Sequence, residues 1–301
     1  MRSSSNPRPY IEKNFQPLLI GGLLTFIYGP VLFHWLDGWV NKSISTDHEY
    51  FSHGLIGIPY AAYIVWQDRK KWTALPDYSH PLGGFLLGLA AVLYVSGTSI
   101  WVNLSFPVML AGICLWFKGI PGLKLLCFPL VLVFLATPNP IPYLITPYTL
   151  PLQTFIAGVS GFLLKQGGFD VAVDGIYISL NGRLVEVAPY CAGLKMLFTS
   201  FYVTLMLLHW TKNLKDVKLS CFLLGSSIVI SVIANTIRNA ILACFHGLGR
   251  QDLFTWLHDG WGGDLYSTIM LLFIVLLFKI VQRWQERTPI ESPTGEINRD
   301  D

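Results

Sequence analysis

The sequence predicts an all-α polytopic membrane protein, and three observations support this fold class. Hydrophobic residues make up 52% of the 301 residues and charged residues only 13%, whereas soluble globular proteins usually carry about 25% charged residues. Apolar stretches of membrane-spanning length recur along the chain. Basic residues gather between these stretches, which is typical of membrane topology and not of nucleic-acid binding. We therefore expect a lipid bilayer around the chain and no nucleic acid as a partner.

Eight apolar stretches are predicted to form transmembrane helices, because a span needs roughly 17–25 mainly apolar residues. They cover residues 17–36, 53–66, 82–101, 103–117, 123–137, 192–210, 219–237 and 262–281. No small-residue cleavage pattern follows the first stretch, so we expect an uncleaved helix there and not a signal peptide. One membrane domain is expected over residues 17–285. Cytoplasmic tails are expected at 1–16 and 286–301, and the second should be disordered.

The distribution of Lys and Arg predicts the orientation of these helices. With both termini in the cytoplasm, the basic loops at residues 69–71, 118–124 and 212–218 also lie inside. The basic residues then left outside or within the membrane are Lys42, Lys165, Arg183, Lys195, Arg238 and Arg250. We therefore predict a multi-pass membrane protein with both termini in the cytoplasm, so that residues at the outer ends of the spans lie on the extracytoplasmic side.

The region between the fifth and sixth predicted spans has a different character. Residues 147–164 are apolar, but four prolines between 138 and 147 and then Pro151 disfavour a continuous straight helix. A re-entrant or interfacial helix on the outer face is favoured over a ninth span. Residues 169–188 alternate between apolar and polar, and Asn181-Gly182 is a strong turn signal, so we expect an extracytoplasmic β-hairpin there.

Cys191 is the first candidate for chemistry. The five cysteines form no CxxC pair, so neither a disulfide framework nor a structural zinc is expected, and most thiols should be buried and inert. Cys191 follows Pro189 at an expected helix start, where unpaired N–H groups and the helix dipole would stabilise a thiolate. The small residues Ala192 and Gly193 would leave room for a substrate backbone. By position alone, a packed, unreactive thiol is equally compatible.

Two further polar residues fall at the same predicted membrane depth as Cys191. Arg238 could stabilise an oxyanion or hold a substrate carboxylate, and Asn235 shares its helix face. The alternative is an interfacial arginine that reaches the lipid headgroups. His258 lies in a loop rich in Gly and Trp and could act as general acid or base, with Asp259 or Asp264 orienting it. A polar residue at headgroup level within an aromatic belt is equally compatible.

His53 is a weaker candidate on the outer side, either a second site histidine or a polar residue at a helix start. His48, Glu49 and His53 lie close together in the sequence, but no further outer-side ligand has convincing spacing, so no metal is predicted. No cofactor is predicted either, because acyl transfer by an activated cysteine runs without one.

Several stretches together resemble the exosortase and archaeosortase family, in the family's order and over roughly residues 45–275. They are Ser52-His53-Gly54, the proline-rich stretch 136–153, VEVAPYCAGL, ANTIRNAIL and the loop with His258. The chain looks most like the cyanobacterial branch. One departure is Cys-Ala-Gly at 191–193, where the family commonly has Cys-Ser-Gly. Lys195, four residues beyond Cys191, has no assigned role.

The resemblance implies a polytopic membrane cysteine transpeptidase. The resemblance further implies cleavage of C-terminal sorting signals, of PEP-CTERM type in bacteria, from exported proteins. Carried over to this sequence, Cys191 is the nucleophile, Arg238 the oxyanion-stabilising or substrate-orienting group, and His258 the acid–base residue. A thioester intermediate would then be resolved by an amine or by water.

Two other functions are compatible with parts of the pattern. A transporter or channel subunit would use Arg238 and the outer histidines as a binding ring, although no inverted repeat is evident and the spans carry few charges. A membrane glycosyl- or acyltransferase would rely on the adjacent pair His258-Asp259.

Overall fold

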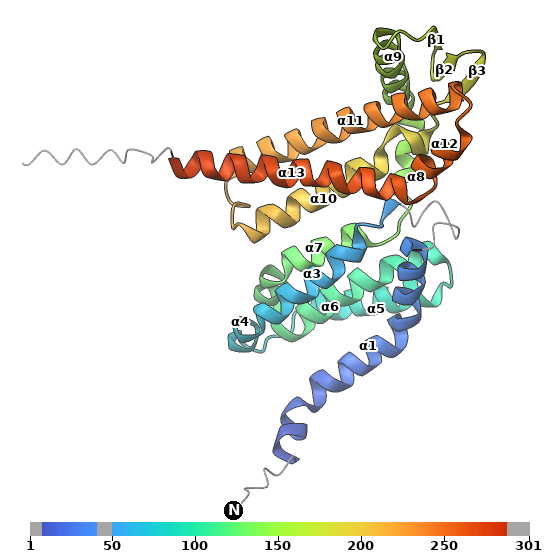
Figure 1. Ribbon diagram of the computed structural model, residues 1–301. Helices are drawn as coiled ribbons and strands as arrows, with labels where there is room; N and C mark the ends of the chain where they lie inside the picture. Colours follow the sequence, from blue (N-terminus) through green and yellow to red (C-terminus); the bar gives the residue numbers. More distant parts are fainter. Residues whose placement is uncertain (1–7, 41–49, 288–301) are drawn as a thin grey trace, which may run out of the picture. The chain divides into compact units, whose positions relative to one another are not determined.

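The computed structural model describes residues 8–40 and 50–287, and the chain divides into two compact units (Figure 1). The first unit is Met1–Tyr148 and the second is Thr149–Asp301. Most of the expected N-terminal tail belongs to a helix that begins at Arg8, while nearly all of the expected C-terminal tail lies outside the described residues.

The regular elements in the described part of the first unit are all helices. Its elements are α1 (Arg8–Val40), α3 (Gly54–Gln67), α4 (Arg69–Ala74), α5 (Pro81–Val95), α6 (Ser99–Leu125), α7 (Cys127–Ala136), α8 (Ile141–Ile145) and the 3-10 helix η1 (Thr146–Tyr148). The indole of Trp35 in α1 donates to Asn103 Oδ1 in α6 at 2.8 Å, and both side chains are buried. An unpaired buried polar group costs about 1–3 kcal/mol, so this pair fixes the register of α1 against α6.

The second unit combines long helices with a small sheet. Its elements are α9 (Leu150–Gln166), β1 (Val171–Asp174), β2 (Tyr177–Leu180), β3 (Arg183–Glu186), the 3-10 helix η2 (Pro189–Ala192), α10 (Leu194–Trp210), α11 (Val217–Gly247), α12 (Gln251–His258) and α13 (Trp261–Arg287). Helices α10, α11 and α13 run alongside one another, and the sheet and α12 lie at one end of them (Figure 1).

The predicted fold class, an all-α polytopic membrane protein, is confirmed. Among the described residues, four helices are long and apolar enough to cross a membrane: α1 over Leu19–Val40, α6, α11 and α13 over Trp261–Trp284. The other four predicted spans fall on α3, α5, α7 and α10, which have 14, 15, 10 and 17 residues. At about 1.5 Å per residue these are shorter than the roughly 30 Å of hydrocarbon. The total of eight crossings therefore stays a prediction.

One predicted span boundary in the first unit is wrong and another is confirmed, and a glycine explains each. The stretch 82–101 was expected to be one helix, but α5 ends at Val95 because Gly97 takes the left-handed backbone (φ 68°). The expected break between 117 and 123 is present as a kink in α6, where Gly119 leaves the helical conformation (φ 58°, ψ −152°). Only glycine adopts such angles without strain.

The region 147–188 also differs in part from expectation. Helix α9 is continuous despite Pro151, because proline at the start of a helix removes no hydrogen bond that the helix needs. Whether α9 lies at the interface stays a prediction. Asn181 (φ 52°) and Gly182 (φ 76°) form the predicted hairpin turn between β2 and β3. The sheet has a third strand, because a turn at Gly175 (φ 58°) pairs β1 with β2.

The core of the second unit joins α9, the sheet and α11. Its buried side chains are Ile156, Ala157, Leu164, Ile178, Leu180, Val187, Ala192, Ala240 and Ala243. Ser160 Oγ of α9 donates to the carbonyl of Thr236 in α11 at 3.0 Å. Because Val187 and Ala192 belong to this core, it anchors both ends of the segment that carries Cys191.

Candidate active site

Cys191 is buried in η2, one turn before α10 begins at Leu194. The N–H groups of Cys191 and Ala192 both donate to the carbonyl of Ala188, at 2.8 and 3.0 Å. Cys191 therefore lies beside the first turn of α10, as expected, within a 3-10 turn that begins at Pro189. Neither of these two N–H groups is available to an oxyanion.

Gly193 links η2 to α10 with a left-handed backbone (φ 83°). A Cβ at this position would lie 2.6 Å from Cγ of Asn235, well inside van der Waals contact. The space beside Gly193 is therefore filled by Asn235, and the expected room for a substrate backbone is not there. Ala192 is buried in the apolar core, where the hydroxyl of a serine would need a partner.

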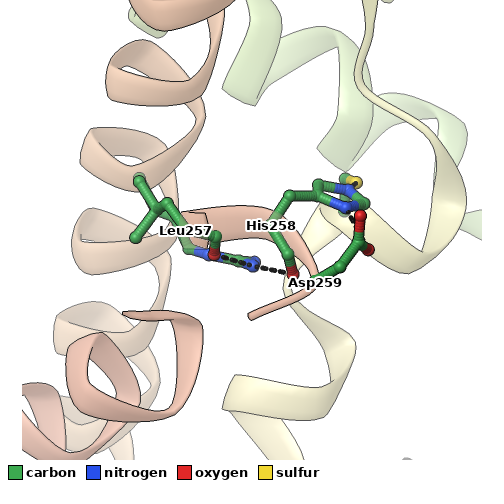
Figure 2. Close-up of polar contacts among 5 residues, drawn as sticks. Leu257, His258 and Asp259 are labelled. Atoms are coloured by element: carbon green, nitrogen blue, oxygen red, sulfur yellow. Dashed lines mark hydrogen bonds and ion pairs between the residues drawn. The ribbon is translucent and has the colours of Figure 1, made fainter. Parts of the chain in front are cut away.

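His258 is the last residue of α12 and meets the thiol of Cys191. Its Nε2 lies 3.4 Å from Cys191 Sγ, and its Nδ1 lies 2.7 Å from Oδ1 of Asp259. The ring of Phe254 stacks on the imidazole, with centroids 5.3 Å apart and planes 8° apart. Figure 2 shows the Asp259 carboxylate beside the His258 imidazole. This is the order nucleophile, base and orienting group that activates a cysteine.

Arg238 reaches from α11 to the end of α12. Its Nη2 donates to the carbonyls of Leu257 and His258, at 3.2 and 3.3 Å (Figure 2). Its Nε is buried and has no hydrogen-bond partner among the described residues. The guanidinium thus binds the backbone of the segment that carries His258. Its buried Nε–H group is a hydrogen-bond donor of the kind that stabilises a developing oxyanion.

The environment of Cys191 favours the neutral thiol. Burial raises the pKa of this thiol to about 11, and the nearby Arg238 guanidinium lowers it only in part. The carboxylates of Asp259 and Glu186 add to the increase in pKa. The thiolate expected from a helix N-terminus is therefore outweighed by desolvation, and forming the nucleophile requires a proton acceptor at the sulfur.

Two asparagines of α11 bind the backbone of Cys191. The side-chain amides of Asn235 and Asn239 donate to the Cys191 carbonyl, at 3.0 and 3.1 Å. From α9, Gln153 Nε2 donates to the carbonyl of Val187 at 2.8 Å. Asn235 was a candidate from the sequence, but Asn239 and Gln153 were missed. The four-residue spacing of the asparagines places both on one helix face and could have identified Asn239.

His53 lies in the first unit, directly before α3. It is buried, and its Nε2 lies 3.1 Å from the carbonyl of Leu135 in α7, so it links two helices of that unit. His48 and Glu49, considered with it as metal ligands, lie outside the described residues. In the part of the chain that is described, no cluster of His, Cys, Asp and Glu could hold a metal ion.

The other cysteines are less uniform than expected. Cys114 is buried and Cys244 is partly buried, but Cys127 and Cys221 are exposed. Cys127 in α7 and Cys221 in α11 were expected to be buried, and for these two cysteines the prediction is wrong.

An apolar cavity of about 450 Å³ lies between α11 and α13. It is lined by α11 between Ile230 and Ile237 and by α13 between Tyr266 and Ile280. At one end the Tyr266 hydroxyl donates to the carbonyl of Ala234. Tyr266 lies one turn beyond Gly263, where a Cβ would be 3.5 Å from Arg238 Nη2, so this end of the cavity lies near the polar residues around Cys191.

Comparison with known proteins gives one result. A family model described as transmembrane exosortase matches residues 35–275, well over half of the chain and all of the candidate site residues. No curated protein matches the chain. No solved structure matches it.

Proposed function

Because the chain belongs to the transmembrane exosortase family, a family of membrane transpeptidases, we propose that it cleaves C-terminal sorting signals of PEP-CTERM type from exported proteins. The reaction takes place at the outer face of the plasma membrane, with Cys191, Arg238 and His258 as catalytic residues. The observation that carries the proposal is the 3.4 Å contact between Cys191 Sγ and His258 Nε2.

In the first half of the reaction, His258 Nε2 accepts the proton of the Cys191 thiol. The imidazolium is stabilised by the Asp259 carboxylate at Nδ1 and by the stacked ring of Phe254. The sulfur attacks the scissile carbonyl carbon, and Arg238 stabilises the negative oxygen of the tetrahedral intermediate. The C–N bond then breaks, His258 protonates the leaving amine, and a thioester on Cys191 remains.

In the second half, an amine or a water molecule attacks the thioester carbonyl. His258 takes the proton from the attacking group, and the sulfur leaves as a thiolate that is then reprotonated. An amine gives a new amide bond, which is transpeptidation, and water gives a free carboxylate. The same three residues serve both halves, as expected for covalent catalysis by a cysteine.

The apolar cavity between α11 and α13 supports lateral docking of the substrate's C-terminal helix. Its lining on α13 runs from Tyr266 to Ile280, which is about 21 Å along the helix axis. It begins beside Arg238, so a substrate helix seated there has its outer end at the catalytic residues. Asn235 supports the site by binding the backbone of Cys191, and Gly193 by leaving space for the Asn235 side chain. His53 is proposed as a supporting residue on the family resemblance alone.

The test is the processing of a PEP-CTERM precursor in the native host. Cys191→Ala should abolish cleavage while the protein accumulates in the membrane at its normal level. Cys221→Ala is the matched control, because it removes an exposed thiol from α11 without touching the site, and it should process normally. Normal processing by Cys191→Ala would refute the proposal.

A further inference from the structure

We propose that Asn235 and Asn239 form an asparagine clamp that positions Cys191 against His258. This inference rests on the proposed function, because it takes Cys191 as the nucleophile and His258 as its base. Both asparagines are positioning residues, since their side chains contact the backbone of the nucleophile and not its sulfur.

The clamp is defined by three hydrogen bonds. The Nδ2 groups of Asn235 and Asn239 converge on the Cys191 carbonyl, at 3.0 and 3.1 Å, and Asn239 Nδ2 also donates to the carbonyl of Asn235 at 2.9 Å. The asparagines are 1% and 5% exposed. Two buried donors on one carbonyl fix that peptide group more tightly than one donor would.

The side-chain amide of Asn235 is oriented so that its nitrogen has a hydrogen-bond partner and its buried oxygen, Oδ1, has none among the described residues. The reverse orientation would set Oδ1 against the Cys191 carbonyl, two acceptors in contact. Native structures rarely leave a buried polar atom unsatisfied, and such atoms call for a functional explanation. We assign the bond to Cys191 as that explanation.

The position of the clamp within α11 explains what it achieves. Arg238 lies between the two asparagines and binds the carbonyl of His258 at 3.3 Å. One helical turn, residues 235–239, therefore holds the backbone of the nucleophile and the backbone of its base. The distance between Cys191 Sγ and His258 Nε2 is set by this shared support, and a backbone shift of about 1 Å would separate the pair.

The experiment measures alkylation of Cys191 by iodoacetamide as a function of pH. It uses the full chain in detergent, with the other four cysteines replaced by alanine. Asn235→Leu/Asn239→Leu removes both donors while keeping a similar shape and adding no charge. At pH 7 we expect alkylation at least about tenfold slower, with a profile displaced to higher pH, because an acid–base partner typically contributes about 10²–10⁴-fold. Ser227→Ala, another buried polar position of α11, should leave the profile unchanged.

Combination with His258→Ala makes the test specific. If the clamp acts through the contact between Cys191 and His258, adding His258→Ala to the double leucine variant should produce no further change. If the effects of the leucine substitutions and of His258→Ala on the alkylation rate multiply, the clamp is refuted. A wild-type pH profile of alkylation in folded leucine variants would also refute it. The single leucine variants each keep one donor, and their pH profiles of alkylation should be displaced in the same direction by a smaller amount. If His258→Ala alone leaves the wild-type profile unchanged, the proposed function fails instead.

Discussion

The reactivity of Cys191 should depend on pH in a way set by its burial. Burial raises the pKa of this thiol to about 11, so below that pH the thiolate fraction increases about tenfold per pH unit. In His258→Ala, which lacks the proton acceptor, the rate of alkylation at Cys191 should therefore keep rising from pH 7 to nearly pH 11. Mass spectrometry of the labelled protein gives the rates. A plateau below pH 8 would show that the thiol ionises at or below its ordinary range.

The carboxylate of Asp259 should contribute less to the rate of precursor cleavage than the Cys191 thiol or the His258 imidazole. It binds His258 Nδ1 at 2.7 Å, but it is mostly exposed, so solvent screens its charge. We expect Asp259→Asn to slow precursor cleavage by about tenfold to a hundredfold, less than loss of the imidazole. Cleavage rates of the purified protein test this, with Asp252→Asn, an exposed acid in the first turn of α12, as the control. A wild-type rate in Asp259→Asn would remove Asp259 from the mechanism.

At the scale of elements, the junction between η2 and α10 depends on Gly193. Gly193→Ala would place a Cβ 2.6 Å from Asn235 at a left-handed backbone position. We expect it to destabilise the fold by about 1–3 kcal/mol, seen as a lower unfolding temperature in detergent, and to impair cleavage as well.

Gly158→Ala is the control for that substitution. Gly158 lies inside α9 with open space around its Cα, so alanine should be neutral or slightly stabilising. Equal unfolding temperatures for the two alanine variants would contradict the role assigned to Gly193.

Local features of these elements were predictable from the sequence, and contacts between distant segments were not. The turn at Asn181-Gly182 follows from two adjacent residues that tolerate positive φ. The bonds from Asn235 and Asn239 to Cys191 join positions 44 and 48 residues apart, and no local pattern encodes them. The prediction of a thiolate at Cys191 was wrong for the same reason, because desolvation depends on the residues that pack around the thiol.

For the whole molecule, the orientation predicted from the basic loops can be tested by labelling. Asp174 in β1 and Lys215 between α10 and α11 are both exposed. In a variant with Cys127 and Cys221 replaced by alanine, Asp174→Cys should react with an impermeant maleimide in intact cells. Lys215→Cys should react only after lysis. The opposite pattern would reverse the topology and place the candidate site on the cytoplasmic side.

Composition and charge predicted the class of the whole molecule, but not the number of its crossings. Four helices have the length and hydropathy of a span, whereas α3 and α7, with 14 and 10 residues, are too short to be judged by composition alone. The three catalytic candidates were identified because each lies in a recognisable stretch. The structure then brought Cys191 and His258 into contact and set Arg238 against the backbone of His258.

The most direct test of the central claim is detection of the acyl-enzyme. The purified chain is incubated with a peptide that carries a PEP-CTERM signal, quenched in acid, digested and measured by mass spectrometry. We predict that the N-terminal part of the substrate is attached to the peptide containing Cys191 through a bond that neutral hydroxylamine cleaves. Cleavage of the substrate by the Cys191→Ala variant, or an adduct on any other residue, would contradict the account.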